Sequence, residues 1–337
     1  MREDVPLATV TRGPLVESVH RGRFVFCDPS GEVLEAVGDP EVPVYPRSSA
    51  KPFQALPLLV SGAADRFGLG EEEIAVVCSS HSGEEAHVEA VRSVLRKAGL
   101  GEEDLGNGAH PPLYGPAAEA LARSGERPRP VHGNCSGKHA GMLALCVHRG
   151  WDVAGYKELE HPVQRGVRAV LARVCGVPEG DLSPARDNCG VQTFALPLRA
   201  LATGFARLAT GEGLCGGIAE AARRVREAMM HNPYLVAGTG RFDTDLMRGA
   251  PLVAKSGAEG VFACGSPEGG WGFALKVSDG AKRAVGPAAA GALARRGVGV
   301  PPGLLSAPVH DLHGGVVGEV RPAFGDRGSG FGRSGAW

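Results

Sequence analysis

Two residues in the first sixth of the chain have the types and spacing for acyl transfer. Ser48 and Lys51 follow an apolar, strand-like run that ends at Tyr45, and they open a helical pattern. On the first turn of a helix, residues three apart share one face and lie within reach of each other. A serine hydroxyl is a weak nucleophile until a base takes its proton, and a lysine becomes that base only when its pKa falls from about 10.4. The spacing predicts a serine–lysine site.

Two later elements extend this pattern. In the penicillin-recognising enzymes, Ser-x-x-Lys acts beside a second serine and a Lys-Thr-Gly strand. Ser80 follows an apolar run (74–78) that predicts a short buried strand, and Lys255 begins a Lys-Ser-Gly sequence before a predicted hairpin. Alone, Ser80 could simply cap a helix and Lys255 could lie on the surface. A clean Ser-Asp-Asn element is missing. The residues that the combined pattern assigns to one catalytic site are Ser48, Lys51, Ser80 and Lys255.

A second cluster combines cysteine, lysine and histidine. Cys135 lies one helical turn before Lys138 and His139, and Cys189 stands in a turn further along the chain. Structural zinc sites usually contain tight cysteine pairs, and buried cysteines are usually core residues. A lysine ligand must also bind as the neutral amine. The spacing by itself therefore does not establish a metal site.

The composition is that of a globular enzyme. The 337 residues suffice for one large domain or two intimate ones, with 43% apolar and 22% charged residues. A formal net charge of −1 gives no reason to expect nucleic acid or an acidic membrane as partner. No apolar run is long enough to span a bilayer, and the N-terminus does not have the layout of a secretory signal. Eight scattered cysteines indicate reduced thiols and a cytoplasmic protein.

The order of predicted elements indicates an α/β (α+β) fold. A β-hairpin is expected over 15–38, and the later strands are expected at 260–264, 271–277 and 315–320. Helices are expected over 84–99, 136–146, 162–174, 193–209, 217–230 and 281–296. The simplest assembly is an antiparallel sheet built from N- and C-terminal strands, flanked by helices, with a helical insertion. The sheet part would cover about 1–60 and 240–324, the helical part 61–239, and a disordered tail 325–337.

Several blocks of the sequence resemble the Rhizobium etli-type L-asparaginases. They are 47–54 (RSSAKPFQ), 78–84 (CSSHSGE), 132–139 (HGNCSGKH), 161–164 (HPVQ), 187–190 (DNCG) and 255–260 (KSGAEG). The resemblance extends from residue 7 to residue 324 and implies a single domain with a fold similar to serine β-lactamases and glutaminases. It also implies hydrolysis of L-asparagine and a homodimer. One departure is 107–112 (NGAHPP), where a Cys-Gly pair and a His-x-Pro element are expected.

The resemblance also implies roles for single residues. Ser48 with Lys51, and Ser80 with Lys255, match two serine–lysine pairs. The residues that match zinc ligands, beside the active site, are Cys135, Lys138 and Cys189. The residues that match polar groups near the substrate and the metal are Arg47, His139 and Asp187.

The expected reaction proceeds through an acyl-enzyme, with one serine attacking the side-chain amide of asparagine. Ser48 is preferred as nucleophile because helix geometry fixes its lysine, and Ser80 with Lys255 would complete a proton relay; the reverse assignment remains open. Zinc would orient the substrate or a water without supplying the nucleophile. Two alternatives are a glutaminase or other serine amidase of the same fold, and a non-catalytic amino-acid-binding or zinc-sensing protein.

Overall fold

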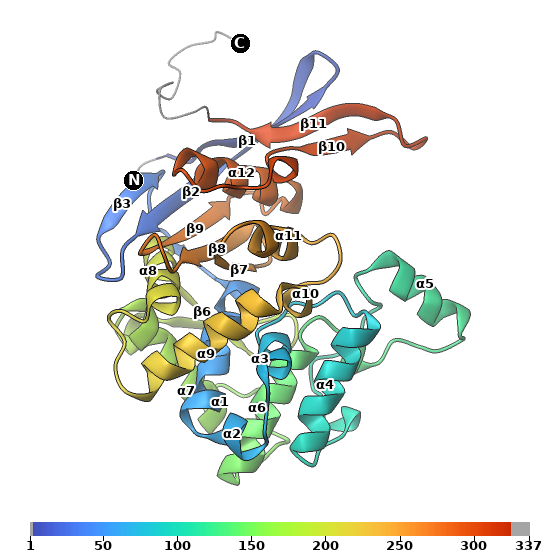
Figure 1. The fold of residues 1–337 in the computed structure, drawn as a ribbon, viewed down its shortest axis with the longest axis vertical. Helices are drawn as coiled ribbons and strands as arrows, with labels where there is room; N and C mark the ends of the chain where they lie inside the picture. Colours follow the sequence, from blue (N-terminus) through green and yellow to red (C-terminus); the bar gives the residue numbers. More distant parts are fainter. Residues whose placement is uncertain (1–2, 325–337) are drawn as a thin grey trace.

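A computed structural model describes residues 3–324, and the tail over 325–337 that was expected to be disordered lies outside this range (Figure 1). The largest feature is an eight-stranded sheet with the order β10-β11-β1-β2-β9-β8-β7, in which β3 also pairs with β2. Its strands are β1 (Val5–Arg12), β2 (Leu15–Cys27), β3 (Val33–Val37), β7 (Val253–Ser256), β8 (Val261–Ser266), β9 (Trp271–Val277), β10 (Ala307–His310) and β11 (Val316–Pro322). Every pairing is antiparallel.

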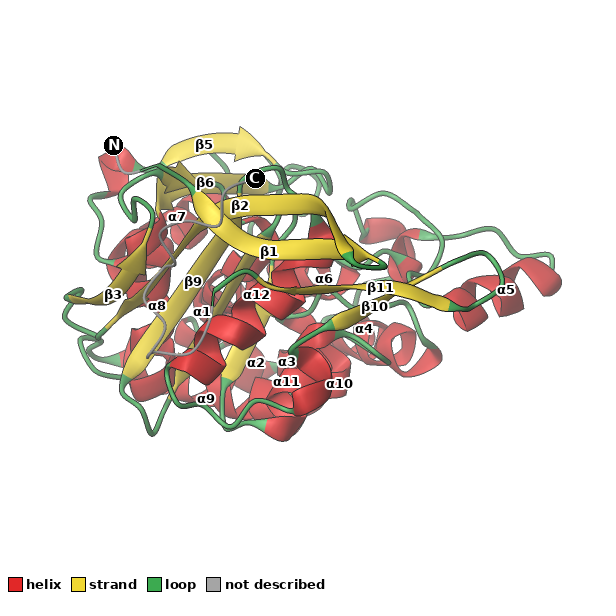
Figure 2. Ribbon diagram, turned by 90° about the horizontal axis from the view of Figure 1, so that it is seen from above, coloured by secondary structure: helices red, strands yellow, loops and turns green. Residues whose placement is uncertain are grey.

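The sheet joins the two ends of the chain, as predicted. Residues of β2 pair directly with residues of β9, for example Phe24 with Leu275. Helices cover both faces: Figure 2 shows α8 (Leu198–Thr210) and α12 (Lys282–Arg295) on opposite sides of the sheet. The rings of Phe26 and Phe273 are tilted against each other in the buried core, with their centroids 4.7 Å apart. The mixed fold with an antiparallel sheet made from N- and C-terminal strands is therefore confirmed.

The middle of the chain forms a helical layer around α1 (Lys51–Val60). Helix α1 is apolar apart from Lys51 and Gln54, and only its last residue, Val60, is exposed. The other helices of this region are α2 (Ala63–Arg66), α3 (Glu71–Val77), α4 (Glu85–Lys97), α5 (Gly115–Arg123), α6 (Ser136–Arg149), α7 (Pro162–Cys175), α9 (Gly217–His231), α10 (Pro233–Val236) and α11 (Phe242–Gly249). A small antiparallel sheet contains β4 (Pro43–Val44), β5 (Ser183–Arg186) and β6 (Gln192–Pro197).

The structure corrects some of the predicted elements. The expected strand at 74–78 is the C-terminal part of helix α3, whose first turn contains three glutamates, with Glu73 bonding back to the Gly70 amide at 2.6 Å. A short apolar run fits a buried strand or a buried helix equally well, and the acidic first turn decides for the helix. The helix expected from 193 begins at Leu198, because β6 occupies the residues before it. Three strands of the main sheet, β1, β7 and β10, were not predicted.

Within residues 3–324, no helix combines the length and apolarity that crossing a membrane requires.

Candidate active site

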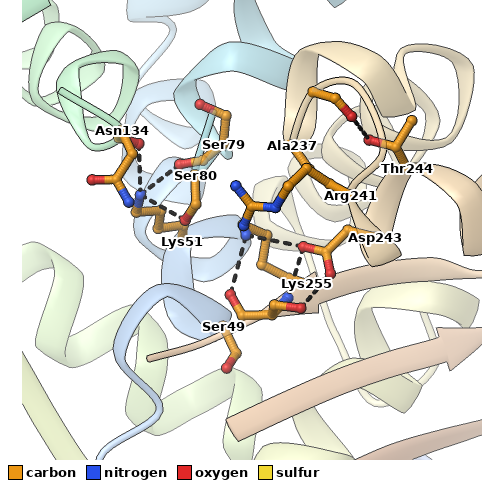
Figure 3. A network of polar contacts seen from close by, with 12 residues as sticks. Ser49, Lys51, Ser79, Ser80, Asn134, Ala237, Arg241, Asp243, Thr244 and Lys255 are labelled. Atoms are coloured by element: carbon orange, nitrogen blue, oxygen red, sulfur yellow. Dashed lines mark hydrogen bonds and ion pairs between the residues drawn. The ribbon is translucent and has the colours of Figure 1, made fainter. Parts of the chain in front are cut away.

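Lys51 lies at the junction between a short 3₁₀ turn, Arg47–Ala50, and helix α1. The chain enters this turn through Arg47, whose φ of 52° is left-handed. Side chains three apart eclipse one another in 3₁₀ geometry, so Ser48 and Lys51 leave the turn on the same side. The amine of Lys51 nevertheless lies 3.0 Å from the hydroxyl oxygen of Ser80 (Figure 3). Within residues 3–324, the Ser48 hydroxyl forms no hydrogen bond.

Burial disfavours the charged form of the Lys51 amine. The side chain is fully buried, and its Nζ also lies 2.6 Å from the carbonyl oxygen of Ser79 and 3.2 Å from that of Asn134. Burial lowers the pKa of Lys51, and the nearby Lys138 adds to this, while Cys135 and Cys189 oppose it. A neutral amine can donate its two hydrogens to the carbonyls and accept the Ser80 hydroxyl proton on its lone pair.

Two helix ends bring Ser80 and Asn134 to this lysine. Ser80 follows the C-terminus of α3, and Asn134 precedes the N-terminus of α6. The two helices touch at Gly137, where a Cβ would come within 2.0 Å of the Val76 carbonyl oxygen. A glycine is therefore required at position 137. The Ser80 amide is fixed by a 2.9 Å hydrogen bond to the Val236 carbonyl, which orients its side chain.

Lys255 belongs to a second buried group beside the first (Figure 3). Its Nζ lies 3.3 Å from Asp243 Oδ2, and the side chains of both residues are almost fully buried. Ser256 donates its hydroxyl and its amide to the two oxygens of Asp243. Burial lowers the pKa of Lys255 to about 8, although the Asp243 charge acts in the opposite direction. Burial alone would raise the pKa of Asp243, but Lys255 and Ser256 outweigh it and the net pKa is lowered.

The end of β7 approaches the Ser48 turn closely. At Gly257 a Cβ would stand 2.6 Å from the Pro46 carbonyl oxygen and 2.7 Å from Ser49 Oγ. The glycine of the Lys255-Ser256-Gly257 sequence thus has a steric role: it lets the strand that carries Lys255 lie against the turn that carries Ser48.

A cavity of about 470 Å³ opens between these groups. Both serines line it, and Lys51 and Lys255 are buried behind the lining residues that they contact. Its other polar lining residues are Asn134, Arg241, Asp243, Ser256, Glu259 and Lys282. Larger hollows of about 840, 750 and 660 Å³ lie elsewhere on the described residues, but no lysine lines any of them. The smaller cavity is therefore the candidate active site.

Cys135, Lys138 and Cys189 also come together, next to Lys51. Lys138 Nζ lies 3.1 Å from Cys189 Sγ, and Cys189 hydrogen-bonds to Cys135. This hydrogen bond and the charges of Lys51 and Lys138 lower the pKa of Cys135, although burial opposes the shift. Two thiols and an amine supply three donors of the sulfur and nitrogen types that tetrahedral zinc sites use. Within residues 3–324, no three His, Cys, Asp or Glu residues form a metal site, so such a site depends on the lysine.

The remaining predicted residues surround this sulfur cluster. Arg47 holds Asp187 Oδ1 through two nitrogens, at 2.7 and 2.8 Å. Lys138 and Arg47 lower the pKa of Asp187 against the effect of burial. His139 Nδ1 lies 2.5 Å from the Tyr156 hydroxyl, while its buried Nε2 has no hydrogen-bond partner among residues 3–324. Burial and the nearby lysines keep the pKa of His139 well below its usual range.

The structure thus brings the predicted residues together but pairs them differently. The sequence predicted Ser48 with Lys51 and Ser80 with Lys255, whereas the hydrogen bonds join Lys51 to Ser80 and Lys255 to Asp243. The reason is reach: a lysine side chain spans several ångströms, so the sequence neighbour is not necessarily the nearest acceptor. The functional groups that sequence reasoning missed are Asn134, Tyr156, Arg241 and Asp243. Asp243 lies in a segment recognised only as a short helix, and no local signal marks it as the partner of Lys255.

Comparisons with solved structures give weak similarities. A protein called Mglu is 18% identical, with a TM-score of 0.35, and the match covers 82% of this chain and 67% of that one. A β-lactamase from Mycobacterium bovis is 14% identical, with a TM-score of 0.40, over 78% and 89% of the two chains. The Bacillus subtilis glutaminase YbgJ, in covalent complex with 5-oxo-L-norleucine, is 14% identical with a TM-score of 0.36, over 80% and 84%. Similarities this weak do not bear on the chemistry of the site.

The comparison with protein families is decisive, whereas none of the curated proteins matches the chain. The family profile described as L-asparaginase II matches residues 8–322, which include all the strands of the main sheet except the first residues of β1. That span also contains every predicted catalytic and ligand residue. The chain belongs to the L-asparaginase II family and is an amidohydrolase by that membership.

Proposed function

We propose that this protein hydrolyses the side-chain amide of L-asparagine to L-aspartate and ammonia by serine–lysine catalysis. The observation that carries the proposal is the 3.0 Å contact between Lys51 Nζ and Ser80 Oγ at the wall of the candidate cavity. A buried lysine of lowered pKa beside a serine in a pocket is the arrangement that activates a hydroxyl.

The reaction divides into two balanced steps. A serine oxygen bonds to the amide carbon while Lys51 takes the hydroxyl proton, and the C–N bond then breaks as that proton passes to the leaving nitrogen, which departs as ammonia. A water next attacks the ester, its proton passes through Lys51 to the serine oxygen, and aspartate is released. The lysine is neutral again at the end of each step.

The contacts favour Ser80 as the nucleophile, because the Lys51 amine is within hydrogen-bond distance of the Ser80 hydroxyl. Ser48, preferred from sequence, also lines the cavity and remains the alternative, one turn from the same lysine. The Ser80 amide is bonded to Val236, so the donors that stabilise an oxyanion must come from other groups of the lining.

Asp243 and Ser256 line the cavity, and Lys255 is buried behind them. Lys255, with a pKa of about 8, can exchange a proton near neutral pH, and Asp243 fixes its position. We assign Lys255 to proton transfer between the site and the solvent. This role replaces the pairing with Ser80 that the sequence predicted.

Zinc belongs to the proposal as a group held by Cys135, Lys138 and Cys189. When bound, it would supply a fixed positive charge beside the site. Binding requires Lys138 to lose its proton. Burial favours this loss, but the charges of Cys189, Cys135 and Asp187 outweigh it and raise the pKa of Lys138. His139 and Asp187, which surround the cluster, would then orient the amino-acid part of the substrate. The resemblance also leads us to expect a homodimer in the cytoplasm. Gel filtration with light scattering would test the oligomeric state.

The deciding experiment measures ammonia release from L-asparagine, with L-glutamine in parallel. We expect asparagine hydrolysis that is lost in Ser80→Ala. A preference for glutamine would keep the site and change the substrate, because one methylene is often worth only about 1–3 kcal/mol. Ligand-induced stabilisation without ammonia from either amide would overturn the enzymatic proposal in favour of a binding protein.

A further inference from the structure

Two cations at the cavity have no carboxylate partner. Arg241 and Lys282 both line it, and among residues 3–324 neither side chain forms an ion pair. Among the residues that the structure describes, the only hydrogen bond of the Arg241 guanidinium is a long one, 3.4 Å from Nη1 to the Ser82 hydroxyl. By contrast, Arg47, the arginine that the sequence placed at the substrate, is neutralised by Asp187. Unpaired cations facing a pocket are suited to an anionic ligand.

The two cations come from different elements and lie close enough to repel. Arg241 precedes the first turn of α11, and Lys282 is the first residue of α12. The Arg241 charge is the main reason that the pKa of Lys282 is lowered. Both helix N-termini therefore point the positive ends of their dipoles at this wall. An anion between the two side chains would relieve the repulsion.

The acids of the cavity do not fulfil this role. Asp243 forms hydrogen bonds through both of its oxygens to Lys255 and Ser256. It forms no ion pair with either cation within residues 3–324, although the Arg241 charge helps to lower the pKa of Asp243 and the Asp243 charge opposes the lowering of the pKa of Lys282. Glu259 is exposed at the cavity, and its side chain has no hydrogen bond or ion pair within residues 3–324. It adopts a left-handed φ of 54°, which costs free energy and is most often kept at functional sites. The cavity thus presents two unpaired cations and one unpaired carboxylate, a combination suited to a zwitterion.

We propose that Arg241 and Lys282 bind a free carboxylate of the substrate and so select amides that carry one. This inference rests on the proposed function, since it names the group that places an amino-acid amide against the serines. The arginine is the main contact because its planar guanidinium can hold both carboxylate oxygens. Glu259, at the same cavity, would face the ammonium group of an amino acid.

The test compares two substrates in wild type and Arg241→Gln: L-asparagine, and 3-aminopropanamide, which is asparagine without its α-carboxylate. We expect kcat/KM for asparagine to fall about 10- to 100-fold, mainly through KM, the range for a lost charge-assisted hydrogen bond. The rate on 3-aminopropanamide should not change. Arg241→Lys should recover part of the loss because it keeps the charge. Lys282→Gln should show a smaller loss of the same kind.

Arg248→Gln is the matched control, because Arg248 is an exposed arginine on α11, the helix that Arg241 precedes, and does not line the cavity. Calorimetric binding of L-aspartate, which should weaken in Arg241→Gln, gives a readout that does not depend on turnover. Equal losses on both substrates would overturn the proposal by showing a structural role. An active wild type with an unaffected Arg241→Gln would also overturn it, whereas an inactive wild type that binds no aspartate would overturn the proposed function first.

Discussion

Lys51 and Ser80 are 29 positions apart in the chain, yet the lysine amine lies 3.0 Å from the serine hydroxyl oxygen. The contact is made by the start of α1 and the end of α3, two buried helices of the same layer. The same amine donates hydrogen bonds to the backbone carbonyls of Ser79 and Asn134. When the amine is neutral, its lone pair is therefore free to accept the serine proton. This relationship defines the chemistry that we expect.

Replacing this lysine should abolish most of the activity. Lys51→Met keeps the length and removes the proton acceptor, so kcat should fall about 10²- to 10⁴-fold, the contribution of a positioned acid–base group. The measurement is steady-state ammonia release, with circular dichroism to confirm folding. Lys97→Met, at a lysine whose amine pairs with Glu73 far from the cavity, is the control. Activity within about threefold of wild type in Lys51→Met would exclude this lysine as the base.

The nucleophile can be located covalently. A diazoketone analogue of asparagine should label Ser80, because its hydroxyl is the one in contact with the buried lysine. Peptide mapping by mass spectrometry identifies the modified residue. Ser48→Ala should still be labelled, and Ser80→Ala should not. A label found on Ser48 alone would restore the assignment preferred from sequence.

The pH dependence of kcat/KM should reflect the titration of Lys255. Its pKa lies at about 8, with Asp243, Lys51 and Arg241 as the charges around it. If its neutral amine accepts protons, kcat/KM should rise with pH and level off above about 8. Lys255→Arg, which keeps the charge but cannot deprotonate, should lower the rate and remove this limb. Lys97→Arg should leave the profile unchanged. A rising limb near 8 that persists in Lys255→Arg would assign the titration to another group.

The Lys255–Asp243 pair should also contribute to stability. Asp243→Asn leaves a buried amine without its partner, and losing one member of a buried pair costs about 3–5 kcal/mol. Folding lowers the pKa of Lys255 from 10.5 to about 8, so below pH 8 the buried ammonium reduces the free energy of unfolding by its full amount. This cost falls as pH rises from 8 towards 10.5, because the amine loses its proton in the folded state. The deficit of the variant should therefore shrink above pH 8. Urea unfolding at pH 7 and 9 measures it, with Asp245→Asn on the same helix as control. Equal deficits at both pH values would argue against a charged Lys255.

Zinc binding can be tested without an activity assay. The purified protein should contain roughly one zinc ion per chain, and Cys189→Ser should lose it because a hydroxyl is a poor replacement for a thiolate ligand. Elemental analysis and the zinc-dependent rise in melting temperature are the measurements. Cys215→Ser, at an exposed cysteine, is the control and should bind zinc normally. A wild type that neither contains zinc nor is stabilised by it would contradict the assignment of these ligands.

The sequence alone determined much of the fold and the composition of the site. Strand patterns at both ends and helices between them predicted the antiparallel sheet, because alternation and helical periodicity are local properties. The spacing of Ser48 and Lys51, and the Lys255-Ser256-Gly257 sequence, identified the segments that meet at the cavity.

Only the tertiary structure decided which groups touch. Lys51 contacts Ser80 because α1 and α3 pack together, and Lys255 contacts Asp243 because β7 lies beside α11. These contacts depend on side-chain reach and on helix packing around glycines such as Gly137, which no local pattern encodes. The tertiary structure also decides that Arg241 forms no ion pair among residues 3–324. Its nearest acid in the chain, Asp243, is bonded to Lys255 and Ser256 instead.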